Sequence, residues 1–296
     1  MNRLVQLFFP LHSALSLGRI RLLFFGLALV LFWKTSFQGV SSLDPVFWYP
    51  FSFFHLVDAP SLSITSAAAL TILWKVSLAL SAIGLISQIS IPIAALLGTF
   101  LFGLRSGFGA TIHSQCYFLL SCWIFAFARC SESFSLDARF FPIEKPQILA
   151  REKLGLYGWP IALLQFLFLW IYFSSAVSKL TQQGLAWATA ENFSAILRYA
   201  GATYRWSSIG ALNMGTHTWL LNQRPLLEIL APLALLTELL APVAFFFRKA
   251  APVTLVSLFL LNVGIWVFLY LNWTPMMLGF LFWLPWRELD GTDRAR

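Results

Sequence analysis

Residues 160–180 read PIALLQFLFLWIYFSSAVSKL, and this stretch decides what kind of protein to expect. Gln165 and Lys179 are its most polar members, and Lys179 is its only charged one. A helix rises 1.5 Å per residue, so about 20 apolar residues cross the hydrocarbon core of a bilayer. The stretch therefore predicts a transmembrane helix, which we place near 154–178.

The composition of the whole chain agrees with this prediction. Of its 296 residues 59% are hydrophobic and only 11% are charged, against roughly 25% charged in an average soluble chain. Such a chain cannot coat itself with polar surface, which excludes a water-soluble globule. The net charge of +8 does not indicate nucleic-acid binding here, because membrane proteins carry Lys and Arg at helix ends as topology signals. The expected partner is the lipid bilayer.

Seven further apolar stretches predict additional spans, so the expected fold is an all-α, polytopic bundle of about eight transmembrane helices with interfacial helices and loops. They lie near 22–40, 62–86, 89–104, 111–128, 225–247, 252–271 and 274–286. The short stretches 89–104 and 274–286 are either spanning, tilted or re-entrant. We expect 1–296 to form one transmembrane domain, in which 1–21 is an interfacial segment, 41–61 an interfacial loop and 287–296 a short cytoplasmic tail.

The basic residues predict the orientation of the bundle. Thirteen Lys and Arg fall on one side of the predicted spans and four on the other. By the positive-inside rule, 129–153 and both termini are cytoplasmic, whereas 41–61 and 180–224 are external. Two termini on one side require an even number of spans, which agrees with eight.

Two charges lie near the middle of predicted spans, Lys75 in 62–86 and Glu238 in 225–247. A charge at that depth is costly, so it usually faces protein and is a candidate functional group. Their similar depth and opposite sign predict a buried pair. That pair serves either helix packing or a proton relay.

A polar stripe marks the outer half of the predicted helix 154–178. Tyr172, Ser175 and Lys179 follow one another at i, i+3 and i+7, which places them on one face. Lys179 is either a snorkelling anchor or a functional group at the outer surface.

Other polar groups share the predicted outer or central layer. His113 opens the span 111–128, with Tyr117 on its face, and is either an interfacial residue or a proton-transfer group at the depth of Lys179. Asn262 lies deep in the span 252–271, where an interhelical hydrogen bond is its default role.

No metal site or disulfide framework is expected. Cys116, Cys122 and Cys130 form no CxxC pair and no Cys/His array with zinc spacing. The chain has no phosphate-binding, HExxH or GxSxG motif. It also lacks an internal repeat, which weakens a small-solute transporter as a function.

Four stretches together resemble the HTTM module, which is similar to the membrane portion of vitamin K-dependent gamma-carboxylase. They are SLGRIRLLFFG, IHSQCYFLLSCWIFAFARCSESFSLDARF, IYFSSAVSKLTQQGLAW and LLEILAPLALLTELLAPVAFF. The resemblance covers essentially the whole chain in order. It implies a membrane enzyme of lyase or carboxylase type that uses a reduced, vitamin K-like quinone, with O2 and CO2 as co-substrates.

The resemblance also implies roles for individual residues. Lys179 matches the lysine that acts as a base, His113 matches the histidine of a His-Ser motif, and Glu238 matches a family glutamate. Deprotonating a hydroquinone needs a neutral amine, which an apolar environment favours. Tyr172, Ser175, Tyr117 and Asn262 are the expected contacts of the quinone.

The chain departs from the family at four points. Ile112 precedes His113 where the carboxylase has a polar residue, and Trp187 lies a few residues later than the usual tryptophan after Lys-Leu. Asn262 stands where a histidine is expected, and the large lumenal region that holds a protein substrate is not expected here. The substrate is therefore unknown. The alternative function is a non-catalytic multi-pass subunit or binding protein that acts through an unknown protein partner.

Overall fold

The computed structural model describes residues 3–50, 53–56, 61–109, 114–204, 208–271 and 273–289. These residues form helices and short 3-10 turns, with no strand among them. Contacts divide the chain into two compact units, residues 1–164 with 281–296 and residues 165–280. The all-helical class is confirmed, and the assignment of both units to one transmembrane domain stays a prediction.

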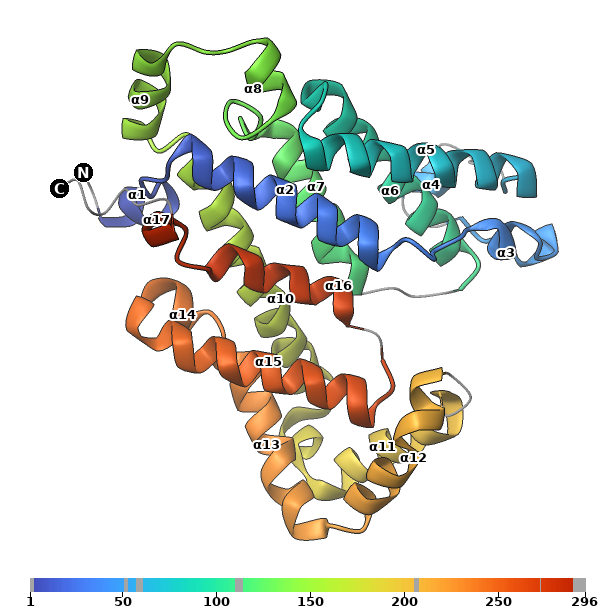
Figure 1. Cartoon of the computed structure of the whole chain (residues 1–296). Coiled ribbons are helices and arrows are strands. Elements are labelled where there is room, and N and C mark those ends of the chain that lie inside the picture. The colour runs from blue at the N-terminus through green and yellow to red at the C-terminus, as the bar shows by residue number, and fades with distance from the viewer. Residues whose placement is uncertain are drawn as a thin grey trace. The chain divides into compact units, whose positions relative to one another are not determined.

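Unit 1 contains four apolar helices of 14 residues or more, joined by shorter elements (Figure 1). Its elements are α1 (Arg3–Phe8), α2 (Ala14–Leu31), α3 (Gln38–Ser41), η1 (Pro45–Phe47), α4 (Phe53–Leu56), α5 (Ile64–Ile83), α6 (Ser87–Gly107), α7 (Ser114–Phe127), α8 (Leu136–Phe140), α9 (Lys145–Lys153) and α17 (Trp286–Leu289). Helix α10 (Gly158–Gln183) starts in unit 1 and continues into unit 2, and η4 (Leu278–Trp283) also belongs to both.

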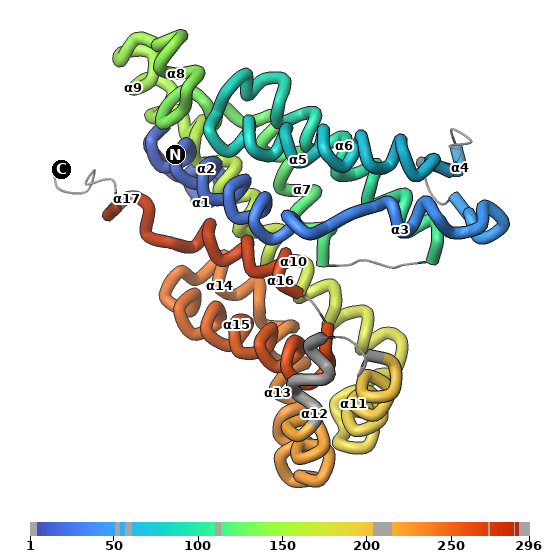
Figure 2. The backbone as a smooth tube through the Cα atoms, turned by 45° about the vertical axis from the view of Figure 1, so that its right-hand side comes forward, coloured from blue at the N-terminus to red at the C-terminus, as the bar shows by residue number. Residues whose placement is uncertain are grey.

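Aromatic side chains form the core of unit 1. Helices α5 and α6 pack as an antiparallel pair, against which α2 and α7 lie (Figure 2). Phe24 of α2 stacks on Phe118 of α7, with 5.8 Å between ring centroids. Trp74 of α5 meets Phe102 of α6 edge to face at 5.6 Å. Such pairs add about 0.5–1.5 kcal/mol each to the burial of the rings.

Arg21 departs from the sequence prediction, which placed it in an interfacial segment. Helix α2 already begins at Ala14, capped by the Ser13 hydroxyl, and Arg21 is completely buried. Its guanidinium donates to the carbonyls of Ser81 at 2.9 Å and Phe134 at 2.7 Å. Ser81 lies in the last turn of α5, where free carbonyls and the helix dipole favour a cation. The apolar helix therefore begins at Ala14, before the start of the predicted span 22–40, and the interfacial position of the residues before it stays a prediction.

The segment between α7 and α10 forms hydrogen bonds and ion pairs, some of them with the ends of other helices. The Asp137 carboxylate accepts the backbone N–H groups of Ile86 and Ser87, each at 2.7 Å, and so caps the start of α6. Glu132 binds Arg151 at 2.6 Å and accepts the Tyr157 hydroxyl. Burial raises the pKa of Glu132, but these hydrogen bonds outweigh burial and leave that pKa below its ordinary value.

Unit 2 packs the second part of α10 with four further helices of 14 residues or more. Its other elements are η2 (Gly184–Ala188), α11 (Ala190–Tyr204), α12 (Ser208–Leu221), α13 (Arg224–Leu240), α14 (Val243–Phe246), η3 (Arg248–Ala250), α15 (Ala251–Phe268) and α16 (Thr274–Met277). Residues 180–224, expected as an external loop, thus contain η2, α11 and α12. The side of the membrane on which they lie stays a prediction.

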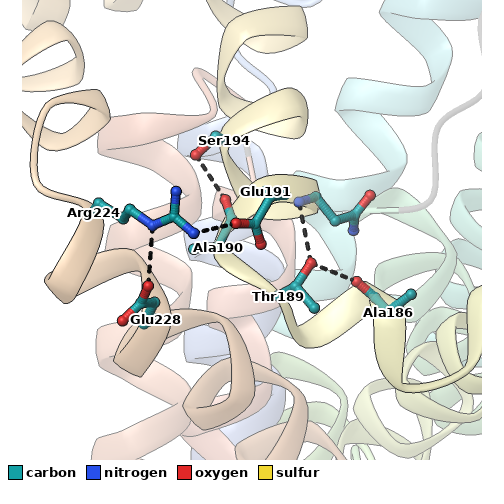
Figure 3. A network of polar contacts seen from close by, with 8 residues as sticks. Ala186, Thr189, Ala190, Glu191, Ser194, Arg224 and Glu228 are labelled. Carbon is teal, nitrogen blue, oxygen red and sulfur yellow. Dashed lines mark hydrogen bonds and ion pairs between the residues drawn. The ribbon is translucent and has the colours of Figure 1, made fainter.

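An exposed ion-pair network connects α11 to α13 (Figure 3). Arg224 contacts Glu191 at 2.5 Å and Glu228 at 3.1 Å. All three side chains are more than half exposed, so solvent screens the pairs and they add little to stability. The Thr189 hydroxyl meanwhile accepts the backbone N–H of Asn192 at the start of α11.

Five helices of the described residues are long and apolar enough to cross a membrane: Ala14–Leu31, Ile64–Ile83, Ser87–Gly107, Gly158–Ala188 and Arg248–Phe268. These overlap five of the eight predicted spans, and the expected 89–104 is a full-length helix rather than a short one. Three others fall short. The described part of 111–128 forms the 14-residue α7, α13 ends at Leu240 before Pro242, and 274–286 divides into α16 and 3-10 turns.

Gly84 provides a test of the Arg21 arrangement. It ends α5 with φ of +70°, and a Cβ there would lie 1.9 Å from Arg21 Nη1. We expect Gly84→Ala to destabilise the protein by at least about 1–2 kcal/mol, the cost of a left-handed residue with a side chain. Gly26→Ala, where a Cβ would meet nothing within 4 Å, should be neutral or stabilising. Thermal unfolding in detergent checks both, and equal midpoints for the two variants would contradict the prediction.

Candidate functional site

The structure joins Lys179 of α10 to Glu238 of α13. Lys179 Nζ lies 2.5 Å from Glu238 Oε2, and the two side chains are 22% and 5% exposed. The Ser175 hydroxyl, one turn before Lys179, lies within hydrogen-bonding reach of the same carboxylate. Two ionisable groups thus share one buried contact in a chain rich in apolar helices.

A second polar contact belongs to the same unit. Asn262 of α15 donates from Nδ2 to the Tyr172 hydroxyl at 2.6 Å and to the Leu258 carbonyl at 2.6 Å. Because that carbonyl can only accept, the amide nitrogen must face it, and Asn262 Oδ1 faces elsewhere. Among the described residues nothing donates to Oδ1, although it is buried. The site therefore contains a buried acceptor that no described residue satisfies, and buried polar atoms in folded proteins normally have a partner.

Tyr172 connects the two contacts. It lies on the stripe of α10 that carries Ser175 and Lys179, and its hydroxyl accepts the hydrogen bond from Asn262. The predicted stripe of α10 is therefore in contact with two other helices, α13 through Glu238 and α15 through Asn262. The residues involved are Tyr172, Ser175, Lys179, Glu238 and Asn262. We call these five residues the Lys179–Glu238 site.

Trp187 is a further member that the sequence analysis did not assign to the site. It lies in η2 and is 9% exposed. Its ring centroid is 4.2 Å from Lys179 Nζ, which is a cation–π contact. The signal available in the sequence was the tryptophan eight residues after Lys179, but only the tight turn after α10 brings it back to the ammonium.

The predicted pair of Lys75 and Glu238 is wrong. Glu238 is paired with Lys179, and Lys75 Nζ donates to the Trp33 carbonyl at 2.7 Å. The prediction relied on depth in the membrane, which says nothing about which face of a helix carries the charge. Lys75 satisfies its ammonium with a backbone oxygen instead of a carboxylate.

The remaining predicted residues are not placed in this site. His113 lies outside the described residues. Tyr117 is buried in unit 1 and donates to the Leu164 carbonyl at 3.0 Å. Within the described ranges no group of three or more His, Cys, Asp or Glu could hold a metal ion.

Comparison of the chain with models of known families, with curated proteins and with solved structures finds no match.

The Lys179–Glu238 contact can be tested by a double-mutant cycle. Glu238→Gln or Lys179→Met alone should destabilise the fold by about 3–5 kcal/mol, because the remaining charge loses its partner. The double variant should recover much of this loss. Folded yield and the thermal midpoint of purified protein measure both effects.

Lys75 is the matched control for this cycle, since it is a second lysine in an apolar helix. Lys75→Met combined with Glu238→Gln should give the sum of the single effects. Additive losses for Lys179 and Glu238, or recovery with Lys75, would contradict the observed pairing.

Proposed function

We propose that the protein is an integral membrane enzyme of the HTTM, vitamin K-dependent gamma-carboxylase-like type, in which the Lys179–Glu238 site transfers protons to and from a reduced quinone. The proposal includes the eight crossings, the cytoplasmic termini and an outer position for the site. The observation that supports it best is the largely buried contact of Lys179 with Glu238, in the same unit as Asn262, whose buried Oδ1 receives no hydrogen bond from the described residues. Ionisable groups kept in an apolar layer commonly have a function.

The chemistry begins with the single proton shared by Lys179 and Glu238. Base catalysis requires the form in which the proton has passed from the ammonium to the carboxylate, and the direct contact between Nζ and Oε2 provides the path for that transfer. Glu238 then holds the proton that left Lys179. The free electron pair on Nζ can accept a proton from a phenolic hydroxyl, which general-base catalysis requires.

The neighbouring groups suit the head of a hydroquinone. Asn262 Oδ1 can accept from one phenolic hydroxyl, and the Tyr172 hydroxyl, which accepts from Asn262 Nδ2, retains a hydrogen to donate. When bound, a reduced quinone would supply the reaction with oxygen that generates a base strong enough to attack a weakly acidic C–H bond. The side chains would orient the ring and receive its proton, and Trp187 would hold the resulting ammonium.

The same contact also supports a second, purely structural function. The Lys179 ammonium is held by both a carboxylate and an indole ring, an arrangement that fixes the end of α10 to α13. In a non-catalytic membrane subunit, this contact would only set helix packing. Such a role predicts tolerance of any replacement that keeps the positive charge.

Lys179→Arg separates the two functions. A guanidinium keeps the ion pair but stays protonated and cannot accept a proton. We expect this variant to fold and to lose oxygen-dependent quinol oxidation by at least about a hundredfold, the usual contribution of a general base. The assay uses purified protein in lipid nanodiscs with a reduced vitamin K analogue, and follows quinol absorbance and oxygen uptake.

Lys75→Arg is the matched control and should keep the wild-type rate, since its ammonium contacts only a backbone carbonyl. Asn262→Leu should raise the KM for the quinol because it removes the unpartnered acceptor. Equal rates for wild type and Lys179→Arg, or no quinol oxidation by wild type, would contradict the enzymatic function and support the structural one.

A further inference from the structure

The segment 131–157 lies where several helices of unit 1 begin or end. Helix α7 ends at Phe127 and α10 begins at Gly158, so the segment connects these two ends. Glu152 accepts the backbone N–H of Ala14 at the start of α2, at 3.0 Å. Asp137 caps the start of α6. Helices α8 and α9 therefore lie at the end of unit 1 where α2 and α6 begin (Figures 1 and 2). In a bilayer, the ends of spanning helices lie at the headgroup layer.

The carboxylates of this segment mostly face the protein. Glu132, Asp137 and Glu152 are partly buried, and each is used by an ion pair or a helix start. Glu144 is the one exposed carboxylate between 131 and 157. The exposed charges of the segment are therefore Arg139, Lys145 and Lys153 against Glu144, which leaves a surplus of two positive charges on the outer surface.

The outer surface of the segment combines cations with large apolar side chains. Lys145, Leu149 and Lys153 follow at i, i+4 and i+8 on one face of α9, and all three are exposed. At the end of α8, exposed Arg139 precedes two phenylalanines. Phe140 and Phe141 are 62% and 78% exposed, and Leu154 after α9 is 68% exposed.

We call the exposed residues Arg139, Phe140, Phe141, Lys145, Leu149, Lys153 and Leu154 the α8–α9 surface. Contact with water alone is unfavourable for its large apolar side chains. Exposed phenylalanine and leucine beside lysine and arginine is the composition of helices that lie in a membrane interface, with rings among the upper acyl chains and cations at the phosphates. The surface lies at the ends of candidate spanning helices, which is where a membrane interface is expected. Its uncompensated charge favours an anionic partner over a neutral one.

From this juxtaposition we propose that the α8–α9 surface is a binding surface for anionic phospholipid headgroups. Arg139, Lys145 and Lys153 contact the phosphates, and Phe140, Phe141 and Leu149 enter the interface. The bound partner is the lipid leaflet and not a second protein. This binding does not depend on the chemistry of the Lys179–Glu238 site.

The test measures which lipids touch the surface. Ala150→Cys, on the exposed side of α9, is labelled with a fluorophore in a Cys116→Ser background, because Cys116 is the exposed native thiol. The protein is placed in nanodiscs that contain phosphatidylcholine and phosphatidylglycerol, with the nitroxide quencher on one or the other lipid. We expect quenching by both, with local enrichment of the anionic lipid by at least fivefold, the factor that roughly one cation near a charged surface provides.

Charge-neutral and matched variants decide whether the three cations are responsible. Arg139→Gln with Lys145→Gln and Lys153→Gln should bring the two lipids to equal quenching. The control, Arg105→Gln with Arg198→Gln and Lys249→Gln, removes the same charge from exposed positions elsewhere and should keep the preference. If the triple variant does not fold, Lys145→Gln and Lys153→Gln are tested singly and should each reduce it.

Two results would overturn the proposal. Absence of quenching by either lipid would show that the surface faces water or a protein partner. Equal quenching by both lipids in the protein with its native cations would show that the charges select no headgroup.

Discussion

Lipid offers no hydrogen bonds, so every charge within the apolar helices must be satisfied by other protein atoms. The positions of three such charges organise much of the structure. Arg21 binds carbonyls from two segments, and Lys179 binds Glu238 across two helices. In each unit a polar contact thus specifies which helices are neighbours, while buried apolar side chains, many of them aromatic in unit 1, form the core.

The sequence was informative about element type and poor about pairing. Length and hydropathy suffice to find helices such as 64–83 and 158–188, since both are one-dimensional properties of the chain. Helix starts were harder. The sequence did not predict the start of α2 at Ala14, because an arginine such as Arg21 is normally exposed to water. Its burial is possible because the carbonyls of Ser81 and Phe134, which are distant in sequence, accept its hydrogen bonds.

For the candidate site, too, the sequence predicted which residues share a helix face but not which residues they contact on other helices. Spacing on one helix placed Tyr172, Ser175 and Lys179 on a common face, and the structure brings that face to Glu238 and Asn262. Depth in the membrane could not identify the partner of Glu238. Depth does not show which helix face carries a lysine, and Lys179 contacts Glu238 whereas Lys75 contacts a backbone carbonyl. The position of Trp187 beside Lys179 depends on the turn after α10, and the sequence pattern of a turn does not show where the chain goes.

The Lys179–Glu238 contact also has an electrical consequence. As a unit of one cation and one anion it carries no net charge, so the membrane potential exerts no net force on it. A proton that passes between the two groups moves at most 2.5 Å, less than a tenth of a hydrocarbon core of about 30 Å. A potential of about 100 mV then changes the energy of that transfer by only about 0.2 kcal/mol. Under the proposed function, proton exchange within this contact would therefore depend very little on the membrane potential.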